Sequence, residues 1–241
     1  MLLNTKHLLN HSKRYLNTST KVTILGGSGF IGNYVIKSLI QDPFVKIQPI
    51  SKSGKENPKI KQLGNQVLST QQGDITNYDQ MEHLCKDANV VINLVGVMNQ
   101  NETNSTNIHI NGAENLAKIT QSNGSKLIHI SAIGANPESS IVYSRTKGLG
   151  EVAVKKHNPN TIIVRPSLVI GPEDDFINRF AKIGKYLPFL PVFGGGLTKF
   201  QPIYVWDLAK AIQILSNNDS FNGKLFEVGG PNGSFIIYII L

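Results

Sequence analysis

A glycine-rich segment, Gly26-Gly27-Ser28-Gly29-Phe30-Ile31-Gly32, follows the short apolar run Val22–Leu25. The apolar run predicts a buried strand, and the apolar periodicity of residues 31–40 predicts a helix, so the glycines lie where a strand turns into a helix. Glycines at this place let backbone N–H groups approach a pyrophosphate, which then lies at the positive N-terminus of the helix. The segment therefore predicts a dinucleotide-binding site. The alternative is a tight strand-to-helix turn without a ligand.

The residues after the next apolar run bear on the choice of dinucleotide. NAD-binding proteins place Asp or Glu near the end of the second strand, where it holds the ribose 2′-hydroxyl. This chain has Ser51-Lys52-Ser53-Gly54-Lys55 there. A carboxylate would repel a 2′-phosphate, whereas Lys52 or Lys55, together with serine hydroxyls, would attract one. The segment favours NADP(H); a basic loop facing only solvent is the alternative.

Two later segments add candidate cofactor-binding residues. Asp74, in Gly73-Asp74-Ile75, follows the expected third strand, where its carboxylate can lie beside an adenine. Asn93, Val95 and Gly96 end the expected fourth strand. Because parallel strands of such a sheet end at the edge where ligands bind, these side chains are expected to border the dinucleotide.

Three further residues could carry out proton transfer. Tyr143 and Lys147 are four residues apart, a spacing that places both side chains on one face of a helix, and Ser131 follows an apolar run. A lysine ammonium beside a phenol would lower the pKa of the phenol and could bind the nicotinamide ribose, so that Tyr143 would donate a proton to a carbonyl. The Tyr-x-x-x-Lys spacing is common by chance, and its place after the fifth expected strand is what gives it meaning.

The elements that must position these residues alternate along the chain. Continuous apolar strands that alternate with amphipathic helices are typical of a doubly wound parallel sheet covered on both faces, an α/β fold of the Rossmann type. The expected strands are 22–25, 46–50, 66–69, 90–95, 127–130, 162–164 and 224–228. The expected helices are 31–40, 77–87, 107–122, 141–156 and 205–216.

The segment after Arg165 differs in composition. Proline and glycine crowd it, with Gly171-Pro172, the triplet Gly194-Gly195-Gly196 and Pro202. Such residues favour loops, which here would line a cleft at the carboxyl edge of the sheet. We therefore divide the chain into a leader (1–20), a dinucleotide-binding domain (21–165) and a cleft-lining segment with a small C-terminal lobe (166–241).

Composition narrows the class of protein. The 241 residues carry a net charge of +8, but four of the basic residues and no acidic residue lie in the first 21, which leaves 20 basic against 16 acidic residues for the rest. This weakens the case for nucleic-acid binding. The single cysteine, Cys85, excludes an intramolecular disulfide and favours a reducing compartment. No apolar run approaches the roughly 18 residues of a membrane span.

The first 20 residues resemble a targeting segment. They are basic, rich in Asn and in hydroxyl side chains, and free of acids, as organellar presequences are. A secretory signal would need a continuous apolar stretch, and Asn10-His11-Ser12 interrupts the run after Leu8-Leu9. The leader predicts a mitochondrial presequence; an N-terminus without a targeting role is the alternative.

The order of these motifs resembles the short-chain dehydrogenase/reductase superfamily, in its extended or atypical branch. The resemblance covers about residues 21–231. It implies that Tyr143, Lys147 and Ser131 correspond to the catalytic residues of the superfamily. It also implies that Asn111, in Asn111-Gly112-Ala113-Glu114-Asn115, corresponds to the asparagine of the catalytic helix.

One subgroup is more similar still. It comprises the NADPH-binding Rossmann accessory subunits of mitochondrial respiratory complex I (NADH:ubiquinone oxidoreductase) and their bacterial relatives. The segments that carry this similarity include Val91–Gly96, Ile128–Ser131, Tyr143–Glu151, Val164–Ser167, Ile170–Asp174 and Gln201–Val205. The resemblance implies a subunit on the matrix side of the inner membrane, peripheral and without a transmembrane span. Its partners would be other complex I subunits, and it would hold NADPH for structure rather than turnover.

The subgroup continues past the Gly229-Gly230-Pro231 turn into a C-terminal lobe, of which residues up to Leu241 would form only a truncated part. Two other functions stay open at this point. One is an NADP-dependent reductase or epimerase that uses Tyr143 and Lys147. The other is a non-enzymatic protein that senses NADPH.

Overall fold

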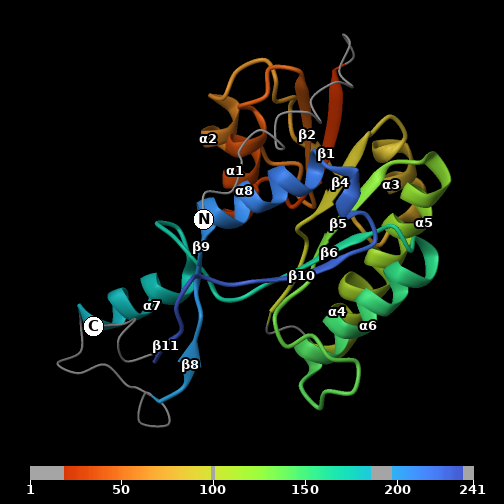
Figure 1. The fold of residues 1–241 in the computed structure, drawn as a ribbon. Helices are drawn as coiled ribbons and strands as arrows, with labels where there is room; N and C mark the ends of the chain where they lie inside the picture. Colours follow the sequence, from red (N-terminus) through yellow and green to blue (C-terminus); the bar gives the residue numbers. More distant parts are fainter. Residues whose placement is uncertain (1–18, 99–100, 186–196, 236–241) are drawn as a thin grey trace, which may run out of the picture.

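A single parallel sheet organises the chain (Figure 1). The computed structural model describes residues 19–98, 101–185 and 197–235. The sheet has seven strands in the order β10-β6-β5-β4-β1-β2-β3. They are β1 (Thr20–Leu25), β2 (Val45–Ser51), β3 (Gln71–Gln72), β4 (Val90–Asn93), β5 (Lys126–Ile130), β6 (Ile162–Pro166) and β10 (Leu225–Val228).

The strand order reverses beside β1, which pairs in parallel with β2 on one side and with β4 on the other. At such a switch point the loops after neighbouring strands leave the sheet in opposite directions, which opens a crevice at the carboxyl ends of the strands. The glycine-rich segment follows β1 and therefore lies at this crevice. The predicted doubly wound α/β fold is confirmed.

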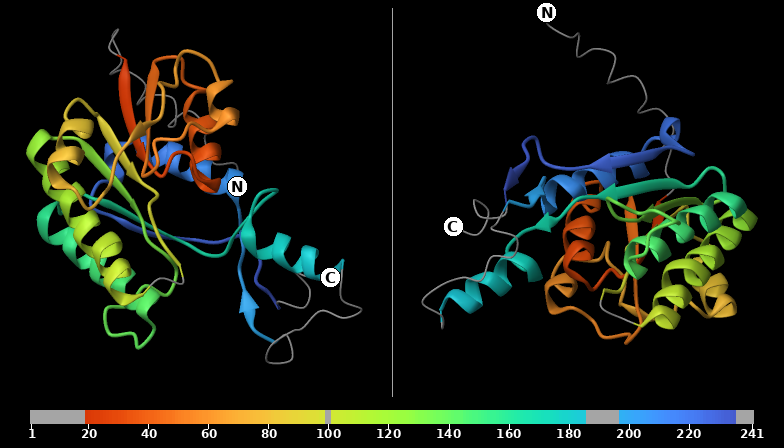
Figure 2. Two further views of the ribbon diagram at one scale, coloured as in Figure 1. Left: turned by 180° about the vertical axis from the view of Figure 1, so that it is seen from behind. Right: turned by 90° about the horizontal axis from the view of Figure 1, so that it is seen from below.

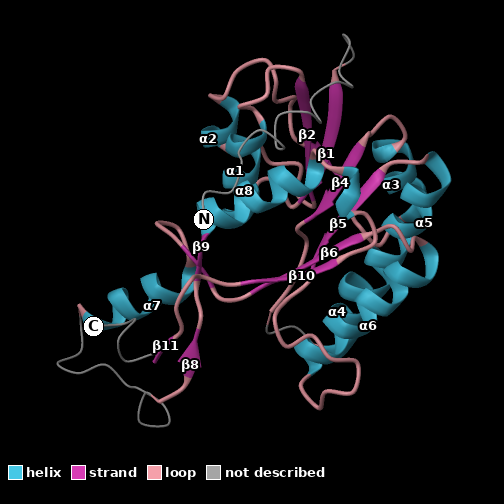
Figure 3. Ribbon diagram, in the orientation of Figure 1, coloured by secondary structure: helices cyan, strands magenta, loops and turns pink. Residues whose placement is uncertain are grey.

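Helices cover both faces of the sheet (Figures 2 and 3). One face packs against α1 (Phe30–Leu39), the short α2 (Pro58–Lys61) and α8 (Val205–Ser216). The other face packs against α3 (Tyr78–Cys85), α5 (Ala113–Asn123) and α6 (Val142–His157), with α4 (Glu102–Thr106) and the π-helix η2 (Asn107–Gly112) leading into α5. Because the inner strands β1, β4, β5 and β6 are buried on both sides, apolar residues occupy successive positions in them, as in Val90–Ile92, rather than alternating with exposed polar residues.

Two expected elements differ in detail from the structure. Residues 66–69 run beside β2, where Ile47 N–H donates to Gln66 O and Leu68 N–H donates to Ile47 O, but the third strand itself is Gln71–Gln72. The expected helix 107–122 starts earlier, in α4, and passes through η2 before α5. A π-helix accommodates a locally wider turn, which a 3.6-residue apolar period does not signal.

The segment after β6 forms a small lobe and then returns to the main sheet. The lobe holds α7 (Asp175–Gly184) and two short strand pairs, β7 (Val169–Ile170) with β9 (Ile203–Tyr204) and β8 (Lys199–Phe200) with β11 (Ser234–Phe235). In Figure 1, α7, β8 and β11 extend away from the sheet. The predicted helix 205–216 and strand 224–228 are confirmed as α8 and β10, with the 3₁₀-helix η4 (Asp219–Phe221) between them.

Candidate functional site: a dinucleotide crevice at the carboxyl edge of the sheet

The turn between β1 and α1 is built by close backbone approach. Gly26 has a φ of +78°, a conformation that favours glycine, and its N–H donates to Ile50 O at the end of β2. A Cβ on Gly32 would lie 2.5 Å from the carbonyl oxygens of both Gly26 and Gly27. A side chain at Gly32 would therefore push α1 away from β1. These glycines hold the start of α1 directly under the crevice.

The N-terminus of α1 is open to a ligand. Gly29 is the N-cap, and among the described residues no side chain caps the first turn. Unsatisfied N–H groups and the helix dipole together make such an end a site for anions. The Asn57 side-chain amide donates to Ser28 O and so fixes the turn from the side of α2. The arrangement fits a pyrophosphate.

A cavity of about 500 Å³ extends from this turn along the carboxyl ends of β1, β2 and β4. This volume lies in the range of small-molecule sites. The predicted residues that line it are Gly26, Ser28, Gly29, Ser51, Lys52, Asp74, Val95 and Gly96. Ser53, one of the serines expected near the 2′-phosphate, lines it as well, whereas sequence reasoning missed the other lining residues as ligand contacts: Leu25, Ile50, Gly73, Ile75, Leu94 and Ile108. Most of these are apolar and form walls that suit a planar base. Another cavity, of about 490 Å³ at the amino ends of β4 and β5, contains none of the predicted site residues.

One end of the cavity, beside β2 and β3, carries charged and hydroxyl side chains, and we call it the ribose end. Ser51 is buried, and its Oγ has no hydrogen-bond partner within the described part of the chain, so a polar ligand would satisfy it. Lys52 Nζ lies 2.9 Å from Asp74 Oδ2, and this hydrogen bond lowers the pKa of Asp74, against the opposing effect of burial. Lys55 is exposed beyond the Gly54 turn and does not line the cavity. Between the two candidate lysines, the structure places Lys52 at the cavity.

Lys147 does not line the cavity but is buried next to Gly96, which does. Its Nζ donates to Ile130 O (3.1 Å), and a Cβ on Gly96 would lie 3.1 Å from the same nitrogen. The side chain is buried, which lowers its pKa to about 8, while the charge of Glu151 one turn later acts in the opposite direction. Glu151 is itself held by Arg165, whose Nε and Nη2 donate to the two carboxylate oxygens at 2.8 and 2.7 Å. Lys147 is thus buried beside Gly96 and close to Glu151, which Arg165 holds in place.

Tyr143 and Ser131 are not among the residues that line the cavity. Burial raises the pKa of Tyr143, in the direction opposite to the lowering by Lys147 that the Tyr-x-x-x-Lys spacing suggested. Desolvation raises the pKa of a phenol because it disfavours the charged form. Ser131 follows β5, is buried, and its Oγ has no hydrogen-bond partner among the described residues.

The structure corrects the role expected for Asn111. Asn111 is exposed on η2, and its amide donates to Asn107 Oδ1, away from the crevice. His109, two residues earlier, is buried instead and packs edge-on against the Tyr143 ring, with centroids 5.7 Å apart. Val97 N–H donates to His109 Nε2 (3.0 Å), so Nδ1 carries the proton and donates to Thr146 Oγ1 (2.9 Å). Burial, followed by the charge of Lys147, lowers the pKa of His109 to about 4, and its ring is neutral.

The side chain of Asn93 also makes its hydrogen bonds within the protein. Its amide donates to His129 Nδ1 (3.1 Å), and its Oδ1 accepts from Val95 N–H (3.0 Å). Asn93 therefore shapes the end of β4 rather than reaching the cavity, which corrects the expected direct contact. Of the remaining predicted residues, Gly27 and Gly32 serve packing, and the Phe30 ring faces Gly171 and Tyr34. Phe30 and Ile31 supply first-turn backbone to α1 and do not line the cavity.

No helix in the described ranges is long and apolar enough to cross a membrane.

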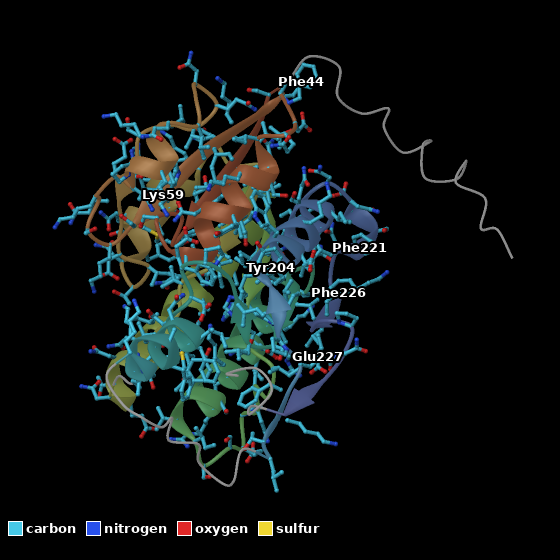
Figure 4. The ribbon with its side chains drawn as sticks, turned by 90° about the vertical axis from the view of Figure 1, so that its left-hand side faces the viewer. Phe44, Lys59, Tyr204, Phe221, Phe226 and Glu227 are labelled. Carbon is cyan, nitrogen blue, oxygen red and sulfur yellow. The ribbon has the colours of Figure 1, made fainter. Side chains whose placement is uncertain are left out.

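Arg165, which holds Glu151, also donates a hydrogen bond to Glu227 Oε1 (3.0 Å). Glu227 lies at the surface on the edge strand β10 (Figure 4). The buried end of the site is therefore connected through Glu151 and Arg165 to the outer edge of the sheet.

Several curated proteins are similar in sequence. The "NADH dehydrogenase [ubiquinone] 1 alpha subcomplex subunit 9, mitochondrial" of Arabidopsis thaliana is 35% identical over 218 residues, which cover 87% of this chain and 54% of that protein. The protein of the same name from Dictyostelium discoideum is 29% identical over 225 residues, covering 92% of this chain and 62% of that protein. The chain thus spans between about half and two thirds of the length of these relatives.

Solved structures share the fold at lower identity. The Bordetella bronchiseptica enzyme WbmG in complex with NAD has a TM-score of 0.79 and 17% identity, covering 93% of this chain and 77% of that chain. A dTDP-4-dehydrorhamnose reductase of Bacillus anthracis in complex with NADP has a TM-score of 0.75 and 21% identity, covering 92% and 79%. Residues 22–229 match the NAD dependent epimerase/dehydratase family. Since this match covers most of the chain, including the glycine turn, the crevice and β10, the protein belongs to the NAD dependent epimerase/dehydratase family, within the extended short-chain dehydrogenase/reductases.

Proposed function

We propose that this protein holds NADP(H) as a non-catalytic accessory subunit of mitochondrial respiratory complex I, on the matrix side of the inner membrane. The observation that carries the proposal is the similarity, at 29 and 35% identity over about nine tenths of the chain, to relatives named as complex I subunits in an amoeba and a plant. A Neurospora crassa relative named "NADH-ubiquinone oxidoreductase 40 kDa subunit, mitochondrial" is 28% identical over 213 residues. The partners would be other subunits of that complex.

The residues around the crevice suit this task. The open N-terminus of α1, with Ser28 and Gly29, would hold the pyrophosphate. Ser51 and Lys52 would bind the adenine ribose and its 2′-phosphate, and Lys147 would bind the nicotinamide ribose. Asp74 would lie beside the adenine. A bound NADPH would supply a hydride donor, but here it would serve to order the loops after β1, β2 and β4.

The environment of Tyr143 supports a role without turnover. A general acid works best when its pKa lies near the working pH, and burial moves the pKa of this phenol further above neutrality. His109, which packs against the ring, is neutral and hydrogen-bonded on both nitrogens, so it is not free to exchange a proton with the phenol. In this proposal Tyr143 packs against His109 and transfers no proton.

A reductase is the second candidate, and one observation favours it. Tyr143 and Lys147 lie on α6, Lys147 Nζ donates to Ile130 O next to Ser131, and Ser131 Oγ is buried with no partner in the described part of the protein. A relative named "Ceramide reductase" from Caulobacter vibrioides is 27% identical over 172 residues, covering 71% of this chain and 53% of that protein.

Turnover assays separate the two candidates. The purified full chain is assayed for NADPH oxidation with aldehydes, ketones and quinones, beside Tyr143→Phe and the matched control Tyr204→Phe, which changes an exposed tyrosine. The accessory-subunit proposal expects NADPH binding within about twofold in all three proteins and no turnover in any. Turnover that Tyr143→Phe abolishes and Tyr204→Phe retains would refute it in favour of the reductase. Co-migration of the protein with a respiratory complex on native gels tests the partner directly.

A further inference from the structure

The lysine expected to recognise a 2′-phosphate already has an anionic partner. Lys52 Nζ and Asp74 Oδ2 are 2.9 Å apart, and both residues line the ribose end of the cavity. The two come from different strands: Lys52 follows β2 and Asp74 follows β3, the edge strand that pairs with it. The ion pair therefore spans the end of the cavity that the adenine ribose would enter.

The carboxylate is the fixed partner of the two. Asp74 Oδ1 accepts from both Thr76 N–H (3.0 Å) and Thr76 Oγ1 (2.8 Å), which leaves Oδ2 directed at the lysine. The side chain of Asp74 is 34% exposed, whereas that of Lys52 is 79% exposed. An ammonium on an exposed, flexible stem can leave a carboxylate at little cost, because exposed ion pairs are weak. The position of Asp74 is set without Lys52.

We infer that Asp74 determines dinucleotide selectivity in this protein, by competing with the 2′-phosphate of NADP(H) for the ammonium of Lys52. The inference rests on the proposed binding of NADP(H). A 2′-phosphate offers more negative charge and more acceptor oxygens than a carboxylate, so it can displace Asp74. The displaced carboxylate nevertheless stays close to the phosphate and repels it. Lys52 thus gives a smaller preference for NADP(H) than an unpaired lysine would.

The neighbouring hydroxyls act differently. Ser51 Oγ and the Ser53 hydroxyl are uncharged, and either can donate to a phosphate or accept from a ribose 2′-hydroxyl. They can therefore hydrogen-bond to NADP(H) and to NAD(H) alike. The discrimination between the two therefore depends on the balance between one cation and one anion, Lys52 and Asp74.

Asp74→Asn tests the inference with two small probes, adenosine 2′,5′-bisphosphate and 5′-AMP, which differ only in the 2′-phosphate. The asparagine keeps an oxygen that accepts from Thr76, so the turn before α3 is preserved, but it removes the charge. We expect calorimetry to show adenosine 2′,5′-bisphosphate binding about two- to fivefold tighter, the range over which exposed ion pairs act. Binding of 5′-AMP should change less, because this probe lacks the 2′-phosphate for which Asp74 competes. The ratio of the two affinities is the readout, since any altered adenine contact affects both probes equally.

Two further variants separate this effect from general electrostatics. Asp79→Asn removes the same charge from an exposed site in the first turn of α3, outside the cavity lining, and should leave the ratio of the two affinities unchanged. Combining Asp74→Asn with Lys52→Gln completes a double-mutant cycle. Without Lys52 there is no cation to compete for, so the gain from Asp74→Asn should fall to the small part that repulsion contributes.

The outcomes are distinct from those of the proposed function. An unchanged or lower preference for adenosine 2′,5′-bisphosphate in folded Asp74→Asn, with both probes still binding, overturns the competition while leaving dinucleotide binding intact. An equal gain in Asp79→Asn also overturns it, since the effect would then be long-range. Failure of both probes to bind to the wild-type chain overturns the competition and the proposed nucleotide site together.

Discussion

Replacing Lys147 by methionine should stabilise the protein without ligand, although the lysine is placed to bind one. Lys147 is only 4% exposed, and Ile130 O accepts a hydrogen bond from its Nζ. Burial lowers the pKa of this ammonium from 10.5 to about 8, even though the charge of Glu151 acts in the opposite direction. Below pH 8 the folded protein therefore keeps a charge that would be better hydrated in the unfolded chain. Methionine has a similar length and no charge.

The size and sign of the effect follow from this shift. Since one pKa unit corresponds to about 1.4 kcal/mol, the shift amounts to about 3 kcal/mol of lost stability at neutral pH. The variant loses the hydrogen bond to Ile130 O, which contributes about 1 kcal/mol. The net gain expected for Lys147→Met at pH 7 is thus about 2 kcal/mol. Because the folded-state pKa is the lower one, the unfolded chain holds more protons between pH 8 and pH 10.5, and the wild type gains stability relative to the variant as pH rises through that window.

The assay is urea unfolding of both proteins at pH 7, 9 and 10. Lys86→Met serves as the control, since it makes the same change at an exposed position after α3. We expect the free energy of unfolding of Lys147→Met to exceed that of the wild type at pH 7, with the difference shrinking toward pH 10, and Lys86→Met to follow the wild type throughout. A variant that is less stable at pH 7, or a difference independent of pH, would refute the reasoning.

Three other predictions concern the glycine turn and the leader. Gly32→Ala should lower stability by about 1–3 kcal/mol in thermal or urea unfolding, because its Cβ meets backbone oxygens at 2.5 Å. Gly29→Ala, whose Cβ would lie 3.2 Å from Gly26 O and which lines the cavity, should retain the fold but weaken NADPH binding at least about tenfold in calorimetry; the reverse pattern would contradict the phosphate cradle. Residues 1–18 lie outside the described residues, so the presequence stays a prediction: a fusion carrying residues 1–20 should enter mitochondria and be cleaved, and a fusion that stays intact in the cytosol would count against it.

Sequence patterns predicted the central strands of the main sheet well because these are buried on both faces, unlike the exposed edge strand β3. Continuous apolar runs such as Val90–Ile92 have few other stable arrangements in a chain of this length, and the glycine turn fixes where the first strand meets its helix. The lobe was harder to predict. The helix α7 follows the turn at Gly171-Pro172, and its N-cap Asp174 accepts from Ile177 N–H, a local signal that the proline- and glycine-rich surroundings obscured.

At the site, the positions of glycines and strand ends were predictable, but the direction of individual side chains was not. Asn111 was expected in the site and His109 was not considered, yet the π-helix at residues 107–112 directs His109 inward and leaves Asn111 exposed. An amide at the end of a strand, as in Asn93, serves a ligand or the protein interior equally well. Only the position of the partner His129 in the next strand decides between them.

The charge of Lys147 explains why the buried polar side chains around it hydrogen-bond to other parts of the protein rather than line the cavity. His109 and His129 are both buried within reach of the charge of Lys147, and burial together with that charge lowers their pKa values to about 4 and about 3. The amide of Asn93 and the N–H of Val97 each donate to one of these rings and so favour their neutral form. Two protonated imidazoles would add to the cost of keeping Lys147 charged. Neutral rings add no positive charge beside the Lys147 ammonium next to Gly96. Burial causes the main shift of the Lys147 pKa and Glu151 opposes it, while Asn93 and Val97 keep the two neighbouring histidines neutral.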